Sequence, residues 1–430
     1  MNSKTAPSEC YVYITLPDAV APVAAAHFKL TRNRTDVPLG RLVYGKSYLA
    51  RDDAVAFDPV ELKLSDRSYE TTALNGIFGA LSDAGPDAWG RRVIERHAGK
   101  AALGELDYLL NSPDDRAGAL GFGLGAQPPA PKREFNQTVQ LAKMQAIADA
   151  IVTDKELPPD PLLTQAQELL LVGTSMGGAR PKAVVEHDGA LWIAKLNRKD
   201  DKWNDARVEH AMLKLARACG LTTAESKIVT VGDRDVLLVK RFDREKTAAG
   251  YERARMISAL TLLQTGDSPR ERDKWSYVLL VEELRRASGE AKKDANELFR
   301  RMCFNALISN VDDHPRNHAL IAKTRDWRLA PAYDLTPQPL VSLEARHLAL
   351  ICGDQGRVAN KTNLLSESAR FLLSYDEASA IATAMEGQVR NTWYEVARAA
   401  GVSEKDCERI KGAFAYPGFD LERVQPVDGN

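Results

Sequence analysis

The apolar and polar positions divide the chain into a β-rich first half and a helical second half. Apolar residues alternate with polar ones over 11–16 and 42–49, which predicts strands. An apolar run over 190–197 predicts another strand, and 235–244 predicts a buried strand that runs into a charged segment. Later, apolar residues recur at intervals of three and four, which predicts helices over 275–287, 295–308, 366–386 and 391–400. This order of elements predicts an α+β fold.

Local signals between these elements predict a helix start and a linker. A glycine-proline turn precedes Asp87, which is placed to cap the helix that follows it. The proline-rich stretch 127–131 predicts a linker, so the first domain is expected to end near residue 128. A helix with one apolar face is expected over 138–152.

Composition restricts the classes of function. A chain of 430 residues is too long for one core and suits two or three lobes. A net charge of −1 excludes nucleic-acid binding by bulk electrostatics, so DNA contact would be local or made through a partner. The five scattered cysteines, without a C-x-x-C pair, fit a reduced cytosol and argue against a disulfide framework. The small-residue run 19–26 is too short to span a bilayer, so we expect a cytoplasmic protein without membrane association.

Three polar residues in the second half have the spacing of a phosphoryl-transfer site. Asn317 is the fifth residue after Asp312, and Asp334 follows 17 residues later. In such sites the first acid orients or deprotonates the attacking hydroxyl, and the asparagine and second acid hold Mg²⁺ against the nucleotide phosphates. Asp313 is the alternative base, but the interval of five favours Asp312. A solvated polar turn after a helix explains the stretch equally well on pattern alone.

The same stretch contains two histidines. His314 and His318 are four residues apart, a spacing that suits a metal pair. Pro315 between them and the lack of a third ligand argue against that interpretation. We expect His314 to shape the loop by hydrogen bonding.

A glycine-rich segment, 173–186, is a candidate phosphate loop. It offers glycines, including Gly177 and Gly178, whose backbone N–H groups can surround phosphate oxygens, together with the hydroxyl of Ser175 and the charge of Lys182. The segment matches neither the Walker A pattern nor the protein-kinase glycine loop. A β-turn is the competing interpretation.

Two further segments could complete a nucleotide site. Lys195 lies inside an apolar strand, where kinases place a lysine that contacts the α- and β-phosphates, and Glu209 on the next predicted helix could pair with it. The alternative places Lys195 on a solvent-facing side of the strand. Backbone groups near Lys240 and Phe242, where the later strand ends, could contact adenine, and a plain edge strand is the alternative there.

Taken together, these segments resemble the HipA family of serine/threonine kinase toxins from bacterial toxin–antitoxin modules. The resemblance spans most of the chain and rests on 83–92, 118–120, 175–182, Lys195, 239–244, 312–317 and 332–334. It implies a two-lobed protein-kinase-like fold: a β-rich accessory subdomain over 1–128, an ATP-binding N-lobe over 129–244 and a helical catalytic C-lobe over 245–430.

The resemblance also implies ATP- and Mg²⁺-dependent phosphorylation of a protein serine or threonine. By analogy Asp312 is the base, Asn317 and Asp334 bind Mg²⁺, and Lys195 contacts the phosphates. The remaining nucleotide contacts that it implies are Ser175, Gly177, Gly178, Lys182, Lys240 and Phe242. Ser175 resembles the loop serine that such kinases autophosphorylate, which expels the loop and inactivates the enzyme, and Thr174 is the alternative acceptor.

The family also implies partners. Its studied targets are aminoacyl-tRNA synthetases, and its partner is a helix-turn-helix antitoxin that carries most of the contact with operator DNA. Two other functions stay open: a catalytically weak kinase-fold co-repressor that acts with a DNA-binding antitoxin, and a small-molecule phosphotransferase.

Overall fold

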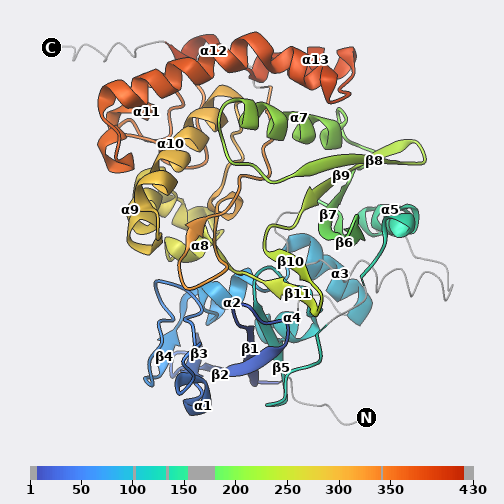
Figure 1. The fold of residues 1–430 in the computed structure, drawn as a ribbon, viewed down its shortest axis with the longest axis vertical. Coiled ribbons are helices and arrows are strands. Elements are labelled where there is room, and N and C mark those ends of the chain that lie inside the picture. The colour runs from blue at the N-terminus through green and yellow to red at the C-terminus, as the bar shows by residue number, and fades with distance from the viewer. Residues whose placement is uncertain (1–6, 100–102, 132–134, 154–179, 340–341, 421–430) are drawn as a thin grey trace. The chain divides into compact units, whose positions relative to one another are not determined.

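The computed structural model of the chain describes residues 7–99, 103–131, 135–153, 180–339 and 342–420 (Figure 1). Two compact units are present, and each is assembled from separated stretches of sequence. Unit 1 comprises Met1–Asp201, Glu225–Asp267 and Ala319–Ala330, and unit 2 comprises Lys202–Ala224, Ser268–His318 and Pro331–Asn430. The domain boundaries expected near residues 128 and 244 stay predictions.

Unit 1 contains a five-stranded antiparallel sheet in the order β4-β3-β2-β1-β5. Its strands are β1 (Glu9–Thr15), β2 (Pro22–Arg32), β3 (Pro38–Tyr44), β4 (Tyr69–Thr71) and β5 (Leu120–Gly123). The helices α1 (Lys46–Leu49), α2 (Gly79–Asp83), α3 (Ala88–Ala98) and α4 (Glu105–Asn111) belong to the same part of the chain. Asp87 caps α3 by accepting a hydrogen bond from the Gly90 N–H at 2.7 Å, as predicted.

A second sheet of unit 1 has four antiparallel strands in the order β6-β7-β9-β8. They are β6 (Lys182–His187), β7 (Ala190–Leu196), β8 (Ser226–Val231) and β9 (Arg234–Lys240). Helix α5 (Leu141–Val152) and helix α3 share a buried core with one face of this sheet, through residues such as Met144, Trp89 and Trp192. Strand β9 is buried on both faces of the sheet from Val236 to Val239, which explains why this part of the sequence is a continuous apolar run.

Two small sheets and a short helix also belong to unit 1. Strands β10 (Arg244–Thr247) and β11 (Gly250–Arg253) form a hairpin. Strand β12 (Arg255–Ser258) pairs with β13 (Ala319–Ala322), which pairs with β14 (Arg328–Leu329). The helix is α8 (Ala259–Leu262).

Unit 2 is built from helices. They are α7 (Asp205–Ala218), α9 (Tyr277–Ala287), α10 (Ala291–Leu307), α11 (Lys361–Ser366), α12 (Tyr375–Ala399) and α13 (Glu404–Ile410). Helix α12 packs against α7 and α10 (Figure 1), and Ser374 with Glu377 forms a capping box at its start. The residues that face neighbouring helices, such as Leu298 and Met302 of α10, are fully buried.

Two sequence predictions of elements are wrong in detail. The strand expected over 42–49 ends at Tyr44, and α1 follows it. Tyr44 and Tyr48 are both buried, and their ring centroids stack 5.9 Å apart. Residues four apart lie on the same side of a strand and also of a helix, so the apolar pattern could not distinguish a continued strand from α1. The helices expected over 366–386 and 391–400 are one helix, α12, which begins only at Tyr375. Val389, in the interval between the two expected helices, is buried and continues the apolar face of α12.

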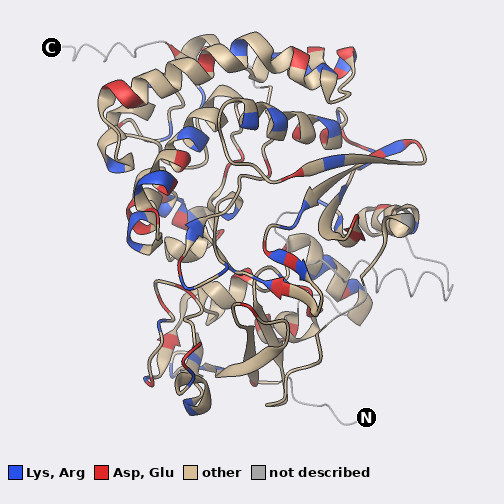
Figure 2. Ribbon diagram, in the orientation of Figure 1, with Lys and Arg blue, Asp and Glu red and all other residues tan. Residues whose placement is uncertain are grey.

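Charged residues of both signs are interspersed along the helices of unit 2 (Figure 2), for example Asp205, Arg207 and Lys214 on α7. Within the described ranges, no helix is long and apolar enough to cross a membrane.

Candidate active site

The loop that carries the phosphoryl-transfer motif follows α10 in unit 2. Ser309, the second residue after that helix, has a left-handed backbone with φ of +54°, and its hydroxyl donates to the carbonyl oxygen of Ala413 at 2.6 Å. The backbone N–H of Asn310 donates to the carbonyl oxygen of Asn305 at 2.8 Å. A short 3₁₀ turn, Pro315–Asn317, then ends the loop. The start of the loop is thus held both to Ala413 and to the end of α10.

The two adjacent aspartates of this loop have opposite environments. Asp312 is exposed to solvent, whereas Asp313 is only 1% exposed. Asp313 accepts hydrogen bonds from the Tyr277 hydroxyl and, at 3.0 Å, from Nε2 of His318. Because a buried, hydrogen-bonded carboxylate cannot meet a substrate hydroxyl, the surroundings favour Asp312 over Asp313 as the base.

Electrostatics distinguishes Asp312 further. Partial burial raises the pKa of Asp312 above its ordinary value, and the charges of Asp334 and Asp313 add to that increase, while His314 opposes it. Asp334, although 22 positions along the chain, therefore lies within electrostatic range of the loop. A raised pKa brings a general base closer to neutral pH, where proton transfer is most effective.

Asn317 and Asp334 supply oxygen atoms of the kind that a hard cation binds. Asn317 is buried, and its Nδ2 donates to the backbone oxygen of Asp312 at 3.2 Å, which leaves its Oδ1 as an acceptor. Asp334 is half-buried in a left-handed conformation with φ of +58°. Such a backbone costs about 1–3 kcal/mol and persists only where neighbouring contacts enforce it. Crowded carboxylates together with a neutral amide oxygen fit a Mg²⁺ ion.

Hydrogen bonds connect the segment before Asp334 to two other parts of unit 2, residues 222–224 and Arg316. Ala332 donates to the carbonyl oxygen of Thr222 at 2.8 Å and accepts from Ala224 at 2.9 Å. The Tyr333 hydroxyl donates to the carbonyl oxygen of Arg316 at 2.8 Å, which ties this segment to the catalytic loop. The structure therefore brings together Asp312, Asn317 and Asp334.

The two histidines of the loop differ in their contacts. Nδ1 of His314 is buried without a hydrogen-bond partner among the described residues, whereas its backbone N–H donates to the carbonyl oxygen of Asp312 at 2.8 Å, and the role expected for His314 stays a prediction. Nε2 of His318 contacts Asp313. Among the described residues, no three His, Cys, Asp or Glu side chains could hold a metal ion by themselves. A cation at Asn317 and Asp334 would therefore need ligands such as nucleotide phosphates.

The predicted phosphate-loop residues Thr174, Ser175, Gly177 and Gly178 lie outside the described residues. Lys182, at the end of that segment, is 2% exposed and forms an ion pair with Asp87 at 2.5 Å. Its backbone oxygen accepts from Nε1 of Trp89 at 3.2 Å. Lys182 thus joins strand β6 to the start of α3 in this structure, and its contact with phosphate stays a prediction.

Lys195 lies on the sheet face opposite the core beneath α5. It pairs in register with Lys182 of β6 and with Leu237 of β9, while its neighbours Ala194 and Leu196 belong to the buried core. Because alternate strand residues face opposite sides, Lys195 shares its face with apolar residues such as Ile193. Lys195 is half-buried rather than fully solvated. Glu209 is buried on α7 in unit 2, and its pairing with Lys195 stays a prediction.

The end of β9 carries a buried ion network that sequence reasoning missed. Arg241 pairs with Asp115 at 2.5 Å and with Asp243 at 2.9 Å, and Arg244 pairs with Asp243 at 2.7 Å. Asp243 also accepts from the Gly118 N–H at 2.9 Å. Two residues here were predicted to lie near adenine. Lys240 forms an ion pair with Glu225 at 2.9 Å, and Phe242, which follows Arg241 in the sequence, is half-buried.

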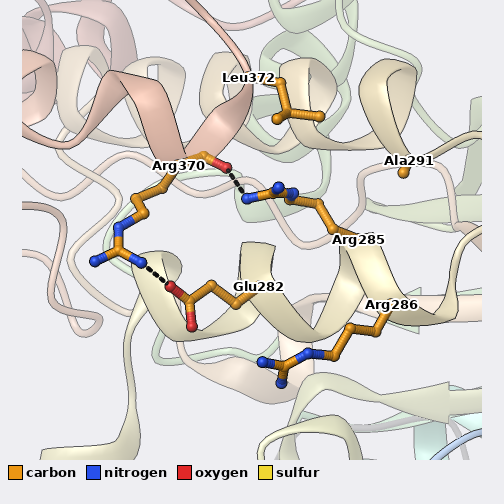
Figure 3. A pocket seen from close by; sticks show the side chains of 6 residues that line it. All are labelled: Glu282, Arg285, Arg286, Ala291, Arg370 and Leu372. Atoms are coloured by element: carbon orange, nitrogen blue, oxygen red, sulfur yellow. Dashed lines mark hydrogen bonds and ion pairs between the residues drawn. The ribbon is translucent and has the colours of Figure 1, made fainter.

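A cavity of about 540 Å³ lies elsewhere on unit 2 (Figure 3). It is lined by Glu282, Arg285, Arg286, Ala291, Arg370 and Leu372. Arg370 pairs with Glu282, and Arg286 pairs with Glu283, so much of its positive charge is already neutralised. No residue of the phosphoryl-transfer motif lines this cavity.

Comparison with known proteins identifies the family of the chain. The family model of the HipA-like C-terminal domain matches residues 174–409, which is more than half of the chain. The chain belongs to the HipA family. The family resemblance seen in the sequence is therefore confirmed.

Relatives in the HipA family include two curated proteins of Sinorhizobium fredii. "Putative kinase Y4mE" is 28% identical over 258 residues, which are 56% of this chain and 56% of the relative. "Putative kinase Y4dM" is 30% identical over 163 residues, which are 35% of this chain and 38% of the relative. The chain therefore spans about half or less of the length of the curated relatives that it matches.

A solved structure has the same fold. It is a chain from the Shewanella oneidensis toxin–antitoxin complex of HipA, HipB and operator DNA, and it matches with a TM-score of 0.68 at 16% identity. The match covers 96% of this chain and 100% of that chain. The predicted α+β, kinase-like fold is therefore confirmed.

Proposed function

We propose that this HipA-family chain is an ATP- and Mg²⁺-dependent serine/threonine protein kinase and the toxin of a type II toxin–antitoxin module. The observation that carries the proposal is the arrangement in unit 2, where an exposed Asp312 with a raised pKa lies near Asn317 and Asp334. A base beside a pair of cation-binding oxygen groups is what phosphoryl transfer requires.

In this proposal, Asp312 orients the hydroxyl of the substrate and accepts its proton. Asn317 and Asp334 hold Mg²⁺, which would neutralise charge on the nucleotide phosphates. Lys195 adds positive charge for the phosphates, and backbone groups near Lys240 and Phe242 receive adenine. Residues 129–244 would bind ATP, 245–430 would supply the catalytic groups, and 1–128 would be the accessory subdomain.

We further propose that Ser175, or Thr174 beside it, is an autophosphorylation site. The proposed partner is a helix-turn-helix antitoxin, through which the chain would reach operator DNA in the cytoplasm. This proposal is supported by the S. oneidensis complex, which contains HipA, HipB and operator DNA. The proposed substrate is a translation component such as an aminoacyl-tRNA synthetase.

Transfer of γ-phosphate from labelled ATP tests the proposal. We expect the wild-type chain with Mg²⁺ to label a protein, and Asp312→Ala to reduce the rate by about 100-fold or more, the usual effect of removing a general base. Glu395→Ala, which removes an exposed carboxylate on α12, is the matched control and should retain the wild-type rate. Labelling that survives Asp312→Ala contradicts the assignment. A labelled metabolite without labelled protein selects the small-molecule phosphotransferase, and ATP binding without transfer selects the co-repressor.

A further inference from the structure

A chain of buried hydrogen bonds lies behind the catalytic loop. Its members are Asn305 of α10, Tyr277 at the start of α9, and Asn310, Asp313 and His318 of the loop, and each is at most 2% exposed. All five belong to unit 2. None of the five is among the residues proposed to carry out phosphoryl transfer, and Asp313 is the aspartate rejected as the base.

In this hydrogen-bond network each side chain donates to the next, in the order Asn310, Asn305, Tyr277 and Asp313. Nδ2 of Asn310 donates to Oδ1 of Asn305 at 3.0 Å, and Nδ2 of Asn305 donates to the Tyr277 oxygen at 3.0 Å. The Tyr277 hydroxyl then donates to Oδ2 of Asp313, the same oxygen that Nε2 of His318 approaches at 3.0 Å. The carboxylate of Asp313 is therefore the final acceptor of two converging donors.

The protonation of the two donors agrees with this direction. Burial raises the pKa of Tyr277 well above its ordinary value, and the charge of Asp313 raises it further, so the phenol keeps the proton that it donates. Nδ1 of His318 is buried without a partner among the described residues. A proton on Nε2 leaves only an acceptor unpaired there, so the network assigns the proton to Nε2.

This hydrogen-bond network anchors the loop next to its proposed functional residues. Asp313 is the neighbour of Asp312, and His318 is the neighbour of Asn317, so each proposed functional residue adjoins one anchored residue. At the other end of the loop, Asn310 is bound to α10 through both its backbone and its side chain. The rings of Tyr277 and His318 also meet edge to face with centroids 5.3 Å apart. A displacement of the Asp313 backbone would therefore move Asp312.

We propose that Tyr277 and His318 are positioning residues for phosphoryl transfer, which act by clamping Asp313 and so fix the place of Asp312 in the loop. They are not catalytic residues, because both are buried and touch Asp313 rather than the solvent-exposed Asp312. The proposal rests on the proposed kinase function. Its physical basis is that a shift of about 1 Å in a reacting group can reduce a rate by about 100-fold.

The test measures kcat and the KM for ATP in four variants. Tyr277→Phe removes one donor to Asp313, and His318→Leu removes the other. His318→Gln keeps an N–H donor near the position of Nε2 and serves as the conservative rescue. Tyr416→Phe is the matched control, because it removes a buried hydroxyl of unit 2 that donates to the Ala359 oxygen at 2.7 Å. Circular dichroism verifies that each variant is folded at the assay temperature.

We expect Tyr277→Phe and His318→Leu to lower kcat by about 10- to 100-fold, as removal of supporting hydrogen bonds commonly does, with little change in the KM for ATP. His318→Gln should recover most of the loss that His318→Leu causes, and Tyr416→Phe should retain the wild-type kcat. If Tyr277→Phe does not fold, the comparison of His318→Gln with His318→Leu decides.

Equal losses in His318→Gln and His318→Leu, or unchanged kcat in the folded variants, would overturn the proposal. A rise in KM with kcat unchanged would do the same, because it places the residues in ATP binding. These outcomes require an active wild-type chain. A wild-type chain that transfers no phosphate refutes the kinase function itself and this inference with it.

Discussion

Asp312 and Asp313 are adjacent and chemically identical, and their surroundings give them different functions. The carboxylate of Asp313 is buried and held by Tyr277 and His318, while that of Asp312 remains exposed beside Asp334. The two lysines proposed to contact the nucleotide phosphates also differ. Lys182 is buried in an ion pair, whereas Lys195 is half-buried. At the scale of residues, burial separates a structural group from a chemical one.

The raised pKa of Asp312 has a consequence for stability. Because this pKa is higher in the folded than in the unfolded chain, ionisation of Asp312 opposes folding, and that cost is present above the folded pKa and absent below the unfolded one. Asp312→Asn should therefore raise the thermal midpoint at pH 7, and the gain should vanish below about pH 4. Calorimetry at both pH values measures this. A lower midpoint than wild type at pH 7 contradicts it, and Glu395→Gln should show no such pH dependence.

Replacement of each lysine by methionine should separate their roles. Lys182→Met leaves Asp87 buried without its partner, and loss of one member of a buried pair typically costs about 3–5 kcal/mol of unfolding free energy. Lys195→Met should unfold at a urea concentration near that of wild type and yet lose phosphoryl transfer. Urea denaturation together with the labelling assay gives both quantities. Wild-type stability in Lys182→Met would show that the ion pair with Asp87 contributes nothing.

At the scale of elements, local pattern predicted most strands and helices, because the periods of two and 3.6 are set by neighbours in sequence. The strands β1, β7 and β9 and the helices α5, α9 and α10 all lie close to the predicted ranges. The pattern failed where a strand passed directly into α1 and where α12 continued through the interval expected between two helices. It also missed the ion network at the end of β9, since Asp115 lies 126 positions from Arg241. The adenine contact expected near Lys240 and Phe242 stays a prediction.

That ion network should make the end of β9 sensitive to charge loss. Burial favours the neutral form of Asp243, but Arg241 and Arg244 outweigh it and hold the pKa of Asp243 well below its ordinary range. A lowered pKa contributes stability that is present above the unfolded pKa and is lost as pH falls toward the folded pKa. Asp243→Asn should therefore reduce the unfolding free energy by about 3–5 kcal/mol at pH 7.

Urea denaturation from pH 7 to acid pH measures this effect. The difference between wild type and Asp243→Asn should shrink as pH falls below the ordinary range of an aspartate. Asp53→Asn, which alters an exposed ion pair with Arg51, is the control and should change stability little. If the unfolding free energies of wild type and Asp243→Asn differ by the same amount at every pH, the charge of Asp243 does not cause the difference.

At the scale of the whole molecule, the two units interleave along the chain. The chain leaves unit 1 after Asp267, forms part of unit 2, and returns to unit 1 over Ala319–Ala330. The returning segment belongs to unit 1 because its strand β13 pairs with β12. We therefore predict that fragments 1–267 and 268–430 do not fold separately, since the cut removes the partner of β12. Circular dichroism and urea denaturation of each fragment measure this, and the same fragments expressed together are the control. Cooperative unfolding of 1–267 alone contradicts it.

By itself, the sequence determined the α+β class, the family, the order of the elements and the spacing of Asp312, Asn317 and Asp334, because periodicity and motif spacing are local properties. Only the tertiary structure decided which aspartate is exposed, since Asp313 is buried by Tyr277 from 36 positions earlier. It also decided that Lys182 pairs with Asp87, 95 positions away. Burial and long-range hydrogen bonding depend on neighbours that are distant in sequence, and a spacing between residues does not contain them.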